Sequence, residues 1–182
     1  MTPLDDTTIR TALGALGRRL RLERDVEIVL VGGAAGVLTG LLPPAWTTAD
    51  VDVIHCKLPE DREAIFAAAA EVAQELSLPP SWLSEDVGLF AWTLPDDWEK
   101  RRVQVGSFGR LRVYAAGRRD LIAMKFLAHR EGDLEHLARM NVVAADLEFV
   151  REYLDGLRHR VPGEAGRIAM ARSYVDAWEV SP

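Results

Sequence analysis

Residues 26–56 read VEIVLVGGAAGVLTGLLPPAWTTADVDVIHC. The first six residues, 26–31, form a β-branched apolar run that predicts a strand, and the run ends at the glycine pair 32–33. The apolar segment after the glycines predicts a short helix that stops at the prolines of 43–44. Residues 49–56 then predict a second strand. This stretch therefore predicts the start of an α/β (α+β) fold, built from a strand, a glycine turn, a short helix and a second strand.

The same stretch combines two features that suit a nucleotide site. A glycine pair at the end of a strand lets the backbone approach a phosphate closely, and the helix that follows directs free N–H groups toward it. Asp50 and Asp52 are two positions apart on the second strand, so both side chains are expected on one face. Neighbouring carboxylates repel one another unless a cation neutralises them, and hard oxygen ligands suit Mg²⁺ or Mn²⁺. The residues predict a phosphate seat beside a divalent metal; the alternative is an exposed strand end with two solvated acids.

The rest of the chain predicts a mixed sheet flanked by helices, followed by a helical part. Helices are predicted at 7–24 and 59–77, an additional strand at 87–94, a hairpin from strands at 101–106 and 110–115, and further helices at 119–131, 133–141, 144–157 and about 163–178. We therefore predict an α/β core over residues 1–116 and a helical C-terminal part over 117–182 that packs on it.

Composition narrows the class of protein. With 182 residues, 48% hydrophobic and 27% charged, the chain is typical of one globular domain or a small domain with a helical extension. The single cysteine excludes an internal disulfide, and no Cys/His cluster is spaced for zinc. The first ten residues have no apolar run, and no apolar segment reaches membrane-spanning length, so we expect a cytoplasmic protein with no membrane partner.

Charge is unevenly distributed along the chain. The formal net charge is −6, with 8 Lys/Arg against 17 Asp/Glu in residues 1–100 and 14 against 11 in residues 101–182. This net charge argues against a protein whose main function is to bind duplex DNA through a basic surface that covers the whole molecule. A local basic surface formed by residues 101–182 remains an alternative.

Two motifs resemble known families. Gly32-Gly33 followed by Asp50-Val51-Asp52 resembles the signature of the polymerase-β-like nucleotidyltransferase superfamily. Residues 121–134, LIAMKFLAHREGDL, are similar to the lysine helix and downstream aspartate of AbiEii-type toxins and their uncharacterised relatives. The resemblance covers about residues 26–137 and implies a nucleotidyltransferase-like mixed sheet followed by a helical C-terminal part.

The resemblance also implies a role for each matching residue. Asp50 and Asp52 would hold Mg²⁺ or Mn²⁺, Lys125 would contact the triphosphate, and Asp133 would assist catalysis. The expected catalytic set is Asp50, Asp52, Lys125 and Asp133, and the expected nucleotide-binding set is Gly32, Gly33, Thr48 and Lys125. The implied function is Mg²⁺-dependent transfer of a nucleotidyl group from an NTP to a hydroxyl on RNA, such as tRNA, or on a protein. The relatives further imply the toxin of a toxin–antitoxin pair, with a cognate antitoxin as partner.

Lys125 and Asp133 can share one cleft only if the helix between them is interrupted. On a continuous helix their eight-residue spacing would separate them by about 12 Å along the axis. Gly132 is predicted to end the first helix, so that Asp133 starts a new one and turns its carboxylate back. The structural alternatives are a solvated helix lysine and an aspartate that serves as an N-cap.

The chain also departs from the family pattern. Trp46 stands where relatives often have a base, and His136 stands where they often have an acid. The predicted strands after Asp52 carry no third metal carboxylate, which leaves Asp86, Asp96 and Asp97 as candidates. A catalytically degenerate nucleotidyltransferase-fold protein that binds or interacts, for example an antitoxin-like partner, is therefore the alternative function.

Overall fold

A computed structural model describes residues 3–56 and 59–179 and divides the chain into two compact units. The first unit comprises Met1–Ala91 and Arg102–Ala116, and the second comprises Trp92–Arg101 and Gly117–Pro182. The segment 92–101 thus belongs with the C-terminal helices, although it precedes the last two strands in sequence.

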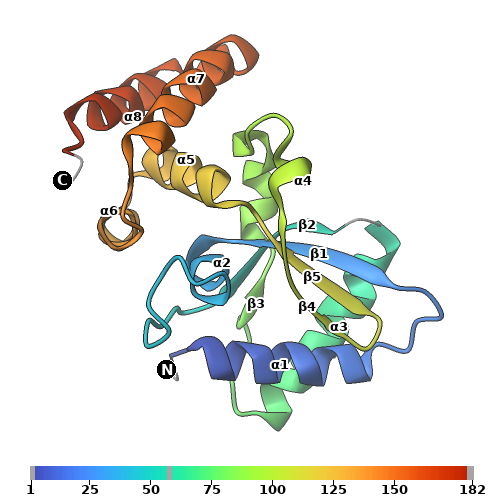
Figure 1. The fold of residues 1–182 in the computed structure, drawn as a ribbon. Coiled ribbons are helices and arrows are strands. Elements are labelled where there is room, and N and C mark those ends of the chain that lie inside the picture. The colour runs from blue at the N-terminus through green and yellow to red at the C-terminus, as the bar shows by residue number, and fades with distance from the viewer. Residues whose placement is uncertain (1–2, 57–58, 180–182) are drawn as a thin grey trace. The chain divides into compact units, whose positions relative to one another are not determined.

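The first unit is built on a five-stranded sheet with the order β3-β2-β1-β5-β4 (Figure 1). Strand β1 is antiparallel to β2 and parallel to β5, so the prediction of a mixed sheet is confirmed. Strand β3 is parallel to β2, and β4 and β5 form the predicted hairpin. The strands are β1 Val26–Val31, β2 Val51–Cys56, β3 Leu83–Ser84, β4 Val103–Phe108 and β5 Leu111–Ala115.

One predicted strand is wrong. The apolar run predicted as a strand at 87–94 forms a 3₁₀ helix, η1, over Asp86–Thr93. A short apolar run has no period long enough to distinguish a strand from a helix. The short strand β3, which lies just before it, was not predicted.

The helices of the first unit pack on this sheet. They are α1 Asp6–Arg19, α2 Gly32–Leu38 and α3 Pro59–Glu75. The carboxylate of Asp5 caps α1 by accepting from the Thr8 N–H at 2.8 Å. Helix α2 ends five residues before the first of the prolines that were predicted to stop it, because Gly40 has φ +74° and the Leu41 N–H turns back to the Gly36 carbonyl at 2.9 Å.

The core of the first unit lies between these helices and the sheet. Strand β1 is almost wholly buried, as expected for a central strand with neighbours on both edges. The largest fully buried side chains in this unit are Leu4, Ile9, Leu13, Leu16, Ile28, Leu30, Leu42, Ile65, Trp82 and Leu111.

Helix α1 approaches the β4–β5 turn through a glycine. A Cβ added at Gly17 would lie 2.0 Å from the Phe108 carbonyl oxygen, so Gly17→Ala must push the helix and the hairpin apart. We expect it to lower the free energy of unfolding by about 3 kcal/mol. Gly14→Ala in the same helix is the matched control, since the nearest atoms are the Arg18 guanidinium at 3.6 Å and the Phe108 ring at 3.9 Å. It should be neutral or stabilise by up to about 1 kcal/mol; equal losses in urea titrations of both variants would contradict the close approach.

The second unit is helical, with α7 and α8 side by side (Figure 1). Its elements are α4 Trp98–Arg101, α5 Arg118–Ala128, α6 Glu131–Arg139, α7 Ala144–Arg160, η2 Pro162–Glu164 and α8 Ala165–Ala177. Helix α5 ends at Ala128 because His129 adopts a left-handed conformation with φ 49°, so the prediction that Gly132 ends it is wrong. Gly156 does not interrupt α7, because an exposed helix interior tolerates a glycine.

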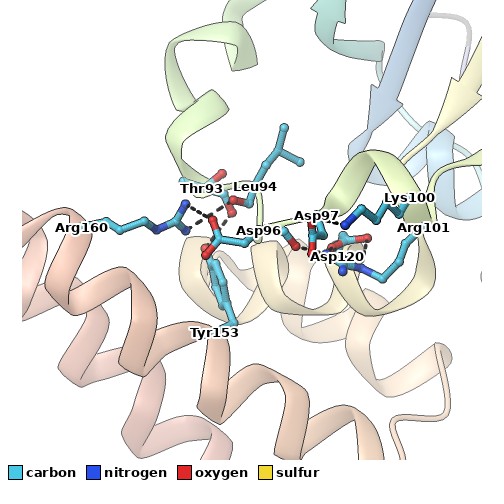
Figure 2. Close-up of polar contacts among 9 residues, drawn as sticks. All are labelled: Thr93, Leu94, Asp96, Asp97, Lys100, Arg101, Asp120, Tyr153 and Arg160. Atoms are coloured by element: carbon cyan, nitrogen blue, oxygen red, sulfur yellow. Dashed lines mark hydrogen bonds and ion pairs between the residues drawn. The ribbon is translucent and has the colours of Figure 1, made fainter.

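Polar contacts attach segment 92–101 to the helices (Figure 2). The Tyr153 hydroxyl donates to the Thr93 carbonyl at 2.7 Å, and burial raises the pKa of that phenol. Arg160 donates to the Asp96 carboxylate at 2.8 Å. The Arg101 guanidinium holds the fully buried carboxylate of Asp120 through Nη2 at 2.6 Å and Nε at 3.1 Å.

A mixed α/β sheet with flanking helices and a helical C-terminal part confirms the predicted fold class. None of the helices in the described part of the chain is long and apolar enough to cross a membrane.

Candidate functional site

The glycine turn of the first unit lies directly against the second strand. In the antiparallel register of β1 and β2, Val31 is opposite Asp52, so the end of β1 meets the start of β2. Gly32 follows with φ +71°, and a Cβ at this position would lie 2.4 Å from the Asp52 Oδ2. Both the backbone conformation and the lack of space require glycine here. The structure therefore brings together two of the predicted site residues, Gly32 and Asp52.

The other predicted residues of this region lie close by in the chain. Strand β2 starts at Val51, so Asp50 immediately precedes it rather than lying inside a strand from 49. Asp50 and Asp52 are both partly exposed, whereas Val51 between them is fully buried, as expected when side chains alternate. Whether the two carboxylates share one ion stays a prediction. Gly33 occupies the first turn of α2.

The backbone of Thr48 is hydrogen-bonded to the N-terminal segment. Its N–H donates to the Leu4 carbonyl at 3.0 Å, and its carbonyl accepts from the Leu4 N–H at 2.9 Å. Thr48 therefore has only its side chain to offer a nucleotide, because its amide already has a partner.

Two carboxylates are the protein's candidate metal ligands. Among residues 3–56 and 59–179, no group of three or more His, Cys, Asp or Glu side chains is placed to hold a metal. Asp50 and Asp52 still fit Mg²⁺, which commonly takes one or two carboxylates together with water and substrate phosphates. Of the candidates for a third carboxylate, Asp96 pairs with Arg160 and Asp97 with Lys100 in the second unit. Asp86 lies in the first turn of η1.

The second unit holds a buried lysine. Lys125 on α5 is 4% exposed, and its Nζ lies 3.0 Å from the Asp133 Oδ1 and 2.6 Å from the His136 Nδ1. The turn at His129 allows α6 to fold back toward α5, so two residues that would be far apart on one helix form an ion pair. Lys125 is therefore no solvated surface lysine.

Asp133 has two partners. It is the third residue of α6, where its Oδ2 accepts from the Arg130 N–H at 3.4 Å, while Oδ1 accepts from Lys125. Arg130, not Asp133, occupies the N-cap position. The carboxylate thus combines a weak contribution to the start of the helix with neutralisation of a buried cation.

His136 is the residue of this cluster that the sequence did not identify as functional. It lies three positions after Asp133, on the same face of α6, and helical spacing could have indicated this. Burial and the neighbouring Lys125 lower the pKa of the His136 imidazole, while Asp133 and Glu135 oppose the shift. Its ring is therefore biased toward the neutral form.

The excess of basic residues found for the sequence range 101–182 is not found in either structural unit. The first unit has 10 Lys/Arg against 14 Asp/Glu, and the second has 12 against 14. Arg118, the first residue of α5, donates to the Met140 and Asn141 carbonyls and to the Asp146 carboxylate. These contacts join the start of α5 to the start of α7. Neither unit carries a net positive charge.

The glycine turn against a strand aspartate, on a mixed sheet that precedes a helical part, is the arrangement that the nucleotidyltransferase resemblance implies. A family model described as "Nucleotidyltransferase of unknown function (DUF6036)" matches residues 12–172. The chain belongs to this family, and the nucleotidyltransferase resemblance is confirmed, whereas the AbiEii-type relationship is not. Searches of curated proteins and of solved structures found no match.

Proposed function

We propose that the protein is a Mg²⁺-dependent nucleotidyltransferase that moves a nucleotidyl group from an NTP to a hydroxyl on RNA or on a protein. The observation that carries the proposal is the contact between Gly32 and Asp52. A glycine with positive φ lets the Asp52 carboxylate lie directly against the backbone at the strand end, where it supplies a hard oxygen ligand. Family membership over residues 12–172 supports the same reaction class.

The residues of the first unit have distinct roles in this proposal. A divalent metal, when bound by Asp50 and Asp52, would neutralise charge on the nucleotide phosphates. The backbone at Gly32 and Gly33 would face the phosphates, because glycine carries no side chain that would keep them at a distance. Asp52 is oriented by the pairing of β2 with β1, so its carboxylate is positioned before any ligand arrives.

The roles of Lys125 and Asp133 are supported by the motif resemblance and by their chemistry. By the motif resemblance, Lys125 would supply a cation for the triphosphate, and Asp133 would take up the proton of the attacking hydroxyl. The two side chains lie 3.0 Å apart, so the cation and the proton acceptor that these roles need stand side by side.

The direct test is to incubate the purified protein with each α-labelled NTP, Mg²⁺ and either total RNA or a protein extract. We expect label to enter one of the two acceptor fractions, and EDTA should abolish the transfer because the phosphates would lose their counter-ion. Tight binding of Mg-NTP without transfer would favour the degenerate binding protein instead. Absence of both binding and transfer would contradict the proposal.

A toxin role is a finer proposal that rests on the similarity of residues 121–134 to AbiEii-type proteins. It predicts that expression of the chain arrests bacterial growth. Growth equal to that of cells expressing the Asp52→Asn variant would contradict the toxin role and leave the transfer reaction to its own test.

A further inference from the structure

The contact between Lys125 and His136 constrains the protonation of both groups. Their nitrogens are 2.6 Å apart, which requires a hydrogen bond, and one nitrogen must supply a lone pair. Asp133 lies 3.0 Å from the same Nζ and stabilises the charged ammonium, which has no lone pair to offer. The lone pair therefore belongs to the His136 Nδ1, and the ring proton belongs on Nε2.

We propose that His136 is a positioning residue: its neutral imidazole accepts a hydrogen bond from the Lys125 ammonium, holds it beside Asp133, and releases it when the ring is protonated. A protonated ring has donors at both nitrogens and a positive charge, so it would face the lysine with no acceptor and with like-charge repulsion. The consequence for catalysis rests on the proposed function, whereas the protonation state of the ring does not.

The charges around His136 within the second unit set the direction of its pH dependence. Lys125 on α5 disfavours the imidazolium, and Asp133 and Glu135 on α6 favour it. Burial is the largest influence and, with Lys125, lowers the pKa below the ordinary value of 6.5. The unfolded chain therefore takes up this proton first as the pH falls. The stabilising contribution is complete above pH 6.5 and is lost as the pH falls through the lower pKa of the folded protein.

A nitrogen NMR titration of the wild-type protein tests the proposal without any nucleotide. We expect His136 to show a protonated Nε2 and an unprotonated Nδ1 near neutral pH, and to titrate below the ordinary histidine pKa of 6.5. A proton on Nδ1, or titration of His136 at or above the ordinary value of 6.5, would overturn the proposal even if the protein transfers nucleotides.

Substitutions separate positioning from simple packing. Glutamine can accept a hydrogen bond and does not titrate, so His136→Gln should retain transfer within about twofold near neutral pH and lose the acid limb of the pH profile. His136→Leu has no acceptor, and transfer should fall roughly tenfold or more while the variant stays folded. His159→Gln and His159→Leu are the matched controls and should leave the profile unchanged.

Two results with these variants would overturn the proposal. One is an acid limb in His136→Gln equal to that of the wild-type protein. The other is equal activity of His136→Leu and wild type across the whole pH range. If the wild-type protein shows no transfer at all, the proposed function fails, and the NMR titration together with thermal denaturation from pH 8 to pH 5 still decides the role of His136.

Discussion

Asp52→Asn is expected to abolish nucleotide transfer while leaving the first unit folded. The asparagine amide has nearly the shape of the carboxylate, so it fits beside Gly32, but it removes the negative charge that a divalent metal needs. We expect the transfer rate to fall at least about a hundredfold and Mn²⁺ binding, measured by electron paramagnetic resonance with an NTP analogue, to fall in parallel.

Glu63→Gln is the matched control for this prediction, because Glu63 is an exposed acid on α3 in the same unit. It removes the same charge and should change neither transfer nor Mn²⁺ binding by more than about twofold. Unchanged Mn²⁺ binding in Asp52→Asn would contradict the assignment of Asp52 as a metal ligand.

Gly32→Ala is a second variant that should lower transfer and Mn²⁺ binding. Its Cβ would displace the Asp52 carboxylate and strain a backbone with φ +71°.

Lys125→Ala is expected to lower the free energy of unfolding by about 3 to 5 kcal/mol. The substitution leaves the Asp133 carboxylate, whose side chain is 17% exposed, without its cation, and it opens a cavity where a buried side chain stood. Urea denaturation followed by circular dichroism measures the loss. A solvated helix lysine, the alternative considered from the sequence, would leave the stability nearly unchanged, and the burial of Lys125 replaces that expectation.

Lys100→Ala is the control for the lysine. Its side chain is 75% exposed and pairs with Asp97 at 2.8 Å, three positions away in sequence, so its loss should change stability by less than about 0.5 kcal/mol. Combining Lys125→Met with Asp133→Asn should restore part of the stability lost in Lys125→Ala, since no unpaired charge remains buried. Equal stability of Lys125→Ala and Lys100→Ala would show that the buried ion pair contributes nothing. Transfer assays on Lys125 variants must therefore be normalised to folded protein.

Local patterns predicted most of the elements but not all of their ends. The apolar run of β1 and the alternation around the Asp50–Asp52 pair are period-two signals that identify strands. The prolines of 43–44 predicted an end of helix α2 that is too late in the sequence, because the turn at Gly40 ends the helix first. Segment 87–94 was assigned to the wrong element, because its apolar residues fit a strand as well as a 3₁₀ helix.

The grouping of segment 92–101 with the helices depends on contacts that are distant in sequence. Tyr153 lies 60 residues from Thr93, and Arg160 lies 64 residues from Asp96. A sequence pattern cannot indicate such pairs, because each partner resembles an ordinary polar surface residue when read alone. The same holds for Gly17, whose necessity comes from the Phe108 carbonyl.

The sequence by itself determined the strand, glycine turn, helix and strand of residues 26–56, since these follow from local periodicity and from the conformational freedom of glycine. The motif resemblance also selected Gly32, Asp52, Lys125 and Asp133 as candidate site residues, and their roles stay predictions. Only the tertiary structure decided that the Asp52 carboxylate fills the space beside Gly32, because that contact depends on the register of two antiparallel strands. The tertiary structure also decided that Lys125 is buried between Asp133 and His136, because a left-handed residue at position 129 turns α6 back on α5. Burial of this kind depends on packing, which no local sequence pattern encodes.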